Sequence, residues 1–312
     1  GGTTWINVFS ATGLVKIHFP TSAIGYAAGG AGAPLYKTMD GGITWTDISL
    51  NVAGHSGGGI WFTSADTGFY AIADFSSSSK ILKTSDGGVS WDTVFSETTS
   101  NWLSYFYFSD SNTGFVTGNK GYIYKTTDGG NNWNGIYMGG NYWMSGVYFF
   151  DGNTGFVSGG NMSGGTHPIW KTTDGGANWQ TVLNLTGGFG ISQVQFPDSN
   201  TGFAILAGNS GNGTLKKTVD GGANWFDDTT PGDSLRTIHF PSKDFGYAVG
   251  KSGTVIKTFT PYAIYGTIYN KDQTASINNG NVYLIEYDTA ATELTYVDSF
   301  ILEGPWNPFW NP

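Results

Sequence analysis

Apolar residues alternate with polar or small ones along most of this chain, in short runs that end at turns rich in Gly, Asp and Asn. Alternation with a period of two predicts β-strands, because successive side chains of a strand point to opposite faces of a sheet. The clearest unit predicts four strands, at residues 102–108, 114–118, 122–127 and 133–137. No stretch has a convincing amphipathic helix period, so the predicted fold class is all-β.

The third strand of that unit ends in a string that the chain repeats. The string reads K-T-x-D-G-G-x-x-W, and its five full copies have their aspartates at Asp40, Asp86, Asp128, Asp174 and Asp220. These aspartates lie 46, 42, 46 and 46 residues apart, a period that indicates a β-propeller or a solenoid. An Asp that can fold back on backbone N–H groups and two Gly that tolerate positive φ predict a tight hairpin turn.

The repeated string resembles the Asp-box, or BNR repeat, of sialidases, sortilin-like receptors, xyloglucan-degrading hydrolases and photosystem II assembly factors. The spacers at residues 108–115 and 196–203, both ending in S-N-T-G-F, are most similar to the photosystem II assembly and stability factor branch. The resemblance covers about residues 1–260 and implies a β-propeller whose aspartates form turns.

Both ends of the repeat region carry half of the string. Residues 1–5 match its second half and residues 255–260 its first half, which predicts that residues 3–9 pair with residues 254–260 and close the ring. Six units follow from the tryptophans at the end of each string. We therefore expect six blades, or seven if a repeat is missing; the tryptophans are Trp5, Trp45, Trp91, Trp133, Trp179 and Trp225.

The period is lost after Pro261. Residues 263–270, 281–288 and 294–302 alternate again and predict three strands. They weakly resemble the start of a carboxypeptidase-regulatory-like β-sandwich. We expect a propeller at residues 1–260 and a small β-sandwich-like module at 261–312, which is either truncated or packed against another chain.

Composition narrows the classes of function. The formal charge of −9, from 23 acidic and 14 basic residues, disfavours nucleic acid as a partner. No apolar run is long enough for a membrane span, and no signal-peptide pattern precedes the first strand. Cysteine is absent, which removes disulfides and thiolate sites. The abundance of Gly, Ser, Thr, Asn and Trp is typical of a secreted, periplasmic or cell-surface bacterial protein.

The acidic residues offer little catalytic chemistry. The five repeated aspartates are interpreted as turn formers, as are Asp66, Asp110, Asp151, Asp198 and Asp244. A sialidase needs several arginines for its substrate carboxylate, and Arg236 is the only arginine. A glycoside hydrolase needs two opposed carboxylates, yet Glu97 is the only glutamate before residue 260. The remaining candidates for a catalytic pair are Asp74, Asp227, Asp228 and Asp233.

The histidines do not cluster, so neither a metal site nor a cofactor is predicted. His18 and His239 occupy matching positions and are interpreted as packing residues between blades. The sequence thus favours a non-enzymatic binding or assembly protein, with a carbohydrate-active glycoside hydrolase as the alternative.

The loops that differ most between units lie opposite the Asp-box turns in a propeller, and they predict the binding site. Their aromatic residues have no repeated counterparts, and such rings serve as anchors in protein and glycan recognition. We expect a site for a protein partner or a glycan, with Glu97 and His55 at its rim. The alternative is that the rings only cap the inner ends of two blades. The predicted site residues are Trp102, Tyr142, Trp143 and His167.

Overall fold

The computed structural model describes residues 6–50, 55–74, 78–98, 101–161, 165–186, 190–207, 214–228, 235–240, 245–250, 255–259, 280–288 and 293–302. These residues form strands and turns, and none of them is in an α-helix. Contacts divide the chain into two compact units, Gly1–Thr260 and Pro261–Pro312.

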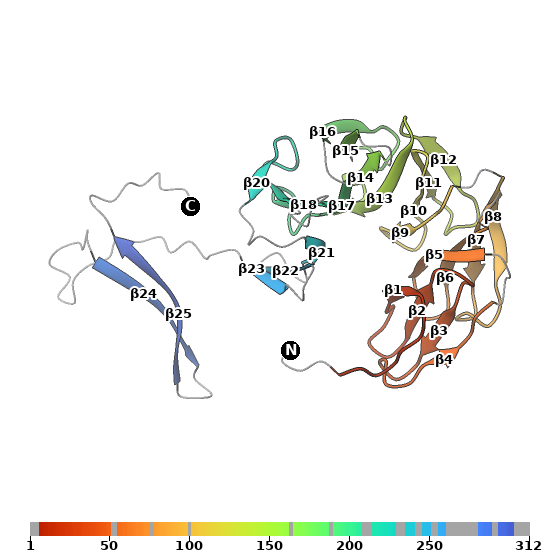
Figure 1. Ribbon diagram of the computed structural model, residues 1–312, viewed down its shortest axis with the longest axis horizontal. Coiled ribbons are helices and arrows are strands. Elements are labelled where there is room, and N and C mark those ends of the chain that lie inside the picture. Colours follow the sequence, from red (N-terminus) through yellow and green to blue (C-terminus); the bar gives the residue numbers. More distant parts are fainter. Residues whose placement is uncertain are drawn as a thin grey trace. The chain divides into compact units, whose positions relative to one another are not determined.

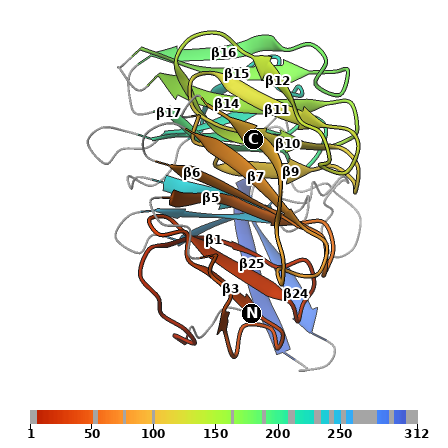
Figure 2. The same cartoon turned by 90° about the vertical axis from the view of Figure 1, so that its right-hand side faces the viewer.

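The first unit is a six-bladed β-propeller. Six antiparallel sheets follow one another in chain order around a ring (Figure 1), and Figure 2 views them from the side. The prediction of an all-β fold with six blades is confirmed. Blade 1 consists of β1 Leu14–His18, β2 Gly25–Gly29, β3 Leu35–Thr38 and β4 Thr46–Asp47, and blade 2 of β5 His55–Phe62, β6 Gly68–Asp74, β7 Ser79–Thr84 and β8 Asp92–Glu97. Blade 3 consists of β9 Tyr105–Phe108, β10 Gly114–Thr117, β11 Tyr122–Thr126 and β12 Asn134–Tyr137, and blade 4 of β13 Tyr142–Phe149, β14 Gly155–Asn161, β15 Thr166–Thr172 and β16 Gln180–Thr186. Blade 5 consists of β17 Gly190–Gln195, β18 Gly202–Ala207, β19 Thr214–Thr218 and β20 Phe226–Asp228, and blade 6 of β21 Leu235–His239, β22 Phe245–Gly250 and β23 Val255–Phe259.

Blade 3 shows how closely the alternation predicts the strands. Three of its four strands begin within one residue of the prediction, whereas β9 begins at Tyr105 and not at Trp102. The backbone N–H of Trp102 donates to the side-chain oxygen of Asn119, 2.9 Å away. That bond takes Trp102 out of the strand ladder and into the loop before it.

The Asp-box turn is a compact hydrogen-bonded unit in each of blades 1–5. In blade 3, the Thr126 hydroxyl donates to Asp128 Oδ1 at 2.9 Å and accepts the N–H of Gly130 at 2.9 Å. The other carboxylate oxygen of Asp128 accepts the side-chain amide of Asn132 at 2.7 Å. The Asn132 side chain and then its backbone N–H lower the pKa of Asp128 to about 2. The two threonine bonds recur in the other four repeats, where the aspartates are Asp40, Asp86, Asp174 and Asp220.

The repeated aspartate thus forms a turn, as expected, but the threonine lies at its buried centre. Thr126 is fully buried, and Thr126→Val would leave the N–H of Gly130 without its acceptor. We expect a loss of about 1–3 kcal/mol in the free energy of unfolding, measured by urea titration. Asp128→Ala removes an exposed carboxylate and should lower the unfolding midpoint by only roughly 2–4 °C. An Asp128→Ala variant that is fully stable but no longer binds its partner would assign the aspartate a functional role.

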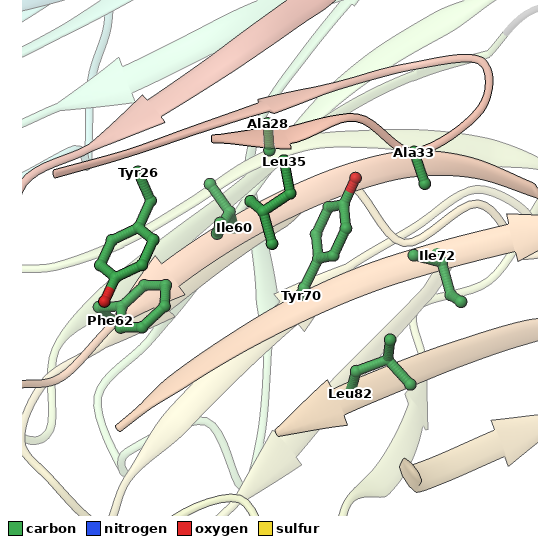
Figure 3. Packing of buried hydrophobic residues seen from close by; sticks show 9 residues of the cluster. All are labelled: Tyr26, Ala28, Ala33, Leu35, Ile60, Phe62, Tyr70, Ile72 and Leu82. Atoms are coloured by element: carbon green, nitrogen blue, oxygen red, sulfur yellow. The ribbon is translucent and has the colours of Figure 1, made fainter. Parts of the chain in front are cut away.

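Aromatic rings form the core between blades. The ring of Tyr26 on β2 stacks on Phe62 of β5, with centroids 3.5 Å apart (Figure 3). An equivalent ring on the second strand of each of blades 2–5 stacks on the next blade, and all these second-strand rings are buried. Each blade therefore depends on its neighbour for much of its apolar burial. The equivalent pairs are Phe69 with Phe108, Phe115 with Phe149, Phe156 with Phe196, and Phe203 with Phe240.

The lysine of the repeat string adds a polar link between blades. Lys125 Nζ donates to the carbonyl oxygen of Gly175 in the next Asp-box turn, at 2.7 Å. Its ammonium also lies 5.7 Å from the ring centre of Phe115, a favourable cation–π position. The same pair of contacts is made by Lys37, Lys83 and Lys171.

His18 packs between blades, as the sequence predicts. Its Nδ1 accepts the backbone N–H of Phe62 at 3.2 Å, and its ring lies 4.5 Å from that of Trp61. Burial lowers the pKa of His18 to about 4, so the ring is neutral at physiological pH and can act as this acceptor. His239, at the matching position of blade 6, is exposed.

Blade 6 has three strands among the described residues. Residues 6–12 are not in a strand, and residues 3–5, 254 and 260 lie outside the described part of the chain. Closure through residues 3–9 therefore stays a prediction at this point.

The second unit contains one antiparallel hairpin, β24 Gly280–Asp288 with β25 Glu293–Leu302. Its two strands coincide with two of the three predicted ones. The third, at residues 263–270, lies outside the described residues, so the β-sandwich-like module stays a prediction.

Candidate functional site

The Asp-box turns and the loops between first and second strands lie at one end of the blades. In blade 3, the N–H of Gly129 donates to the carbonyl oxygen of Asn112 at 2.9 Å. Equivalent bonds join the two loops in the other four blades that carry the motif. In that loop, Asp110 Oδ1 accepts the N–H groups of Asn112 and Thr113, which is the turn role expected for it. The loops that differ between blades therefore lie at the opposite end of the blades. Asp151 and Asp198 make the same turn, and Asp244 lies outside the described residues.

At that opposite end, the turn between β10 and β11 joins two segments of the predicted site. The N–H of Gly121 donates to the carbonyl oxygen of Tyr142 at 2.9 Å, and Asn119 accepts from Trp102. Lys120 and Gly121 in this turn both have positive φ, 60° and 75°. The turn thereby holds Trp102 on one side and Tyr142 with Trp143 on the other.

Glu97 and Asn101 fix the loop that carries Trp102. The Tyr124 hydroxyl donates to Glu97 Oε2 at 2.5 Å, and Asn101 Nδ2 donates to the same oxygen at 3.2 Å. Asn101 is buried, and its carbonyl oxygen accepts the hydroxyl of Ser79 at 2.7 Å. Burial, followed by the bond to Glu97, raises the pKa of Tyr124. Tyr124 and Asn101 therefore hold Glu97 in place at the edge of the site, near Trp102 in the chain.

Two further aromatic residues, which were not among the site residues predicted from the sequence, lie beside this turn. Tyr122 and Tyr137 face each other across β11 and β12 with ring centroids 4.9 Å apart, and Tyr137 is 58% exposed. The Tyr137 hydroxyl donates to Gly140 just before Tyr142. Both residues belong to the strands that the predicted Asp-box turn joins, and their pairing across that hairpin is the sequence signal that could have identified them. We call the following five residues the aromatic surface: Trp102, Tyr122, Tyr137, Tyr142 and Trp143.

Two rings of the aromatic surface lie on blade 4. Tyr142 packs edge-on against Trp170 at 5.4 Å, and its hydroxyl lies 3.1 Å from that of Thr166. Trp143, the next residue on β13, is half-buried. Tyr142 is thus fixed by the blade.

The two histidines of the predicted site belong to strands of blades 2 and 4. His167 on β15 is fully buried, so it lies within blade 4 and not on its surface. His55 begins β5, where its carbonyl oxygen accepts the N–H of Gly32 from blade 1. Sequence alternation could not place His167, because residues 167–170 of β15 are all buried and the burial of this strand does not alternate.

Within the described ranges, no group of three or more His, Asp or Glu side chains is arranged to hold a metal ion. In the same ranges, no helix has the length and apolar character that crossing a bilayer would require.

Comparison with known proteins finds no matching family model and no matching curated protein. Solved structures do match. A GH74 enzyme of Niastella koreensis is 15% identical with a TM-score of 0.64, and the match covers 78% of this chain and 45% of that one. The GH74 xyloglucanase of Xanthomonas campestris is 14% identical with a TM-score of 0.61, covering 93% of this chain and 52% of that one. YCF48 from Cyanidioschyzon merolae is 18% identical with a TM-score of 0.48, covering 81% and 96%.

At these identities the likeness is one of fold. The chain spans about half the length of the two GH74 enzymes that it matches. Propellers with catalytic and with other roles share this architecture, so function has to be argued from the site.

Proposed function

We propose that this protein is a non-enzymatic binding or assembly protein outside the cytoplasm, secreted, periplasmic or on the cell surface. The aromatic surface at the loop end of blades 3 and 4 binds its ligand, which is a protein segment or a glycan. The observation that supports the proposal is the turn between β10 and β11, whose bonds join the backbone segments of Trp102 and Tyr142 beside the paired rings of Tyr122 and Tyr137.

The chemistry of this surface suits binding. Tyr and Trp rings provide large contact areas at a small cost in conformational entropy, and amides beside them adapt to polar groups of a ligand. Here the turn supplies Asn119, and buried Asn101 holds the loop in place. Because the Tyr137 and Tyr142 hydroxyls and the backbone of Trp102 are already hydrogen-bonded, little ordering of these residues is left for the binding step.

A glycoside hydrolase would need two carboxylates facing each other across the substrate. Beside the aromatic surface, Glu97 provides one, and it is already bonded to Tyr124 and Asn101. The Asp-box carboxylates are engaged in turns at the other end of the blades. This arrangement favours binding over hydrolysis.

The double variant Trp102→Ala, Trp143→Ala tests the proposal. Each ring is a candidate hot spot worth about 2 kcal/mol, so affinity should fall at least about 30-fold. Binding is measured on a panel of soluble plant and bacterial glycans and on an array of extended peptides. Scanning the glycan panel for released sugar tests the hydrolase alternative on the same samples.

Phe226→Ala serves as the matched control, because Phe226 is an aromatic residue 46% exposed on blade 5. It should bind as the parent does, and both variants should keep the parent unfolding temperature. Unchanged affinity of a folded double variant would place the binding site elsewhere, and sugar release by the parent would establish an enzyme.

A further inference from the structure

Phe9 contacts blade 1 in the same way that a residue on the fourth strand of a blade contacts the following blade. Phe9 and Phe95 each follow the tryptophan of their repeat string by four residues. Phe9 packs on Tyr36 with centroids 4.8 Å apart and planes at 61°; Phe95 packs on Tyr124 of the following blade at 4.8 Å and 57°. Tyr36 and Tyr124 both directly precede the lysine of the string. Residues near Phe9 therefore occupy the place of a fourth strand belonging to a blade that precedes blade 1.

Blade 1 presents an apolar face of the kind that other blades bury. Ile17 is 63% exposed and Phe19 is 39% exposed. The residues at the position of Phe19 in the four following blades are at most 7% exposed, because the ring of the preceding blade stacks on each of them. Those residues are Phe62, Phe108, Phe149 and Phe196.

Blade 6 presents the complementary face. Tyr247 corresponds to the stacking rings of the other blades, yet it is 39% exposed, and Val249 beside it is 37% exposed. Lys257 lies 5.9 Å from the ring centre of Tyr247, as Lys37 lies over Tyr26. The side of β22 and β23 that faces a following blade is thus already organised as a junction.

We propose that blade 6 packs directly on blade 1 and that the segment around residues 6–9 is its fourth strand, beside β23. The junction is a sixth copy of the other five: Tyr247 stacks on Phe19, and Lys257 donates to the carbonyl oxygen of Gly41. Gly41 follows the Asp-box aspartate, as Gly87 does where it accepts from Lys37. The partner of this apolar face is therefore the chain itself, and closure buries Ile17 and Val249 together.

Cross-linking tests the junction cleanly, because the chain has no cysteine of its own. The variant Ile17→Cys, Val249→Cys is treated with a short bifunctional thiol reagent and analysed by mass spectrometry. We expect a cross-link within one chain in most molecules. The pair Ile205→Cys, Ile238→Cys provides the reference, since it occupies the same two positions at the junction of blades 5 and 6 within one buried cluster.

The control Val89→Cys, Val249→Cys should stay unlinked, because Val89 lies at an exposed Asp-box tip of blade 2. Links only between chains, or none while the reference pair reacts, would overturn the proposal. Removing residues 1–9 from the test pair should lower the yield several-fold. An unchanged yield would show that these residues are not the fourth strand.

Discussion

Phe115→Ala is expected to lower the free energy of unfolding by about 3–5 kcal/mol, the range for deleting a buried Phe ring. Phe115 is 1% exposed and stacks on Phe149 at 4.5 Å, so its loss opens a cavity between blades 3 and 4. The ammonium of Lys125 also loses the ring beneath it. Urea titration of the purified variant measures the effect.

Phe226→Ala is again the matched substitution, since that ring is 46% exposed. It should cost less than about 1 kcal/mol, as surface substitutions usually do. Equal losses from the two variants would contradict a core built from stacked rings between blades.

Gly130→Ala should be damaging for two separable reasons. Gly130 has φ +75°, where a side chain costs about 1–2 kcal/mol. A Cβ at this position would also lie 2.2 Å from the ring of Phe69, which is fully buried and stacked on Phe108. Relieving that overlap costs about a further 1–3 kcal/mol.

Gly139→Ala separates the two reasons. Gly139 has φ +87°, but a Cβ there would meet no atom within 4 Å. Its free energy of unfolding should fall only by the backbone cost, and the difference between the two variants then measures the overlap with Phe69. If Gly139→Ala were as destabilising as Gly130→Ala, the second glycine of the string would be needed for its backbone conformation alone.

Much of this fold can be predicted from the sequence, because its strands and turns are determined by residues that are close together in the chain. Alternation with a period of two predicts the strands, and a fixed repeat with Asp and two Gly predicts the turns that join them. The count of six blades follows from the repeat alone. What the string does not reveal is that the Thr126 hydroxyl accepts the N–H of Gly130 and that Lys125 donates to the carbonyl oxygen of Gly175, because these contacts form only in the fold.

The candidate site divides in the same way. Trp102, Tyr142 and Trp143 are recognisable because no other unit repeats them, and the turn of β10 and β11 brings their segments together. Tyr122 and Tyr137 lie inside predicted strands, where aromatic residues are ordinary packing groups. His167 was predicted to lie in a loop that differs between blades, whereas β15 buries it within the blade.

Hydrogen–deuterium exchange of the full chain, with and without the tightest ligand from the glycan and peptide panels, tests the central claim most directly. If the aromatic surface is the binding site, exchange slows at residues 101–104, 118–122 and 137–143, and the Asp-box turns exchange as before. Slower exchange at the Asp-box turns, with no change in those three segments, would contradict the account.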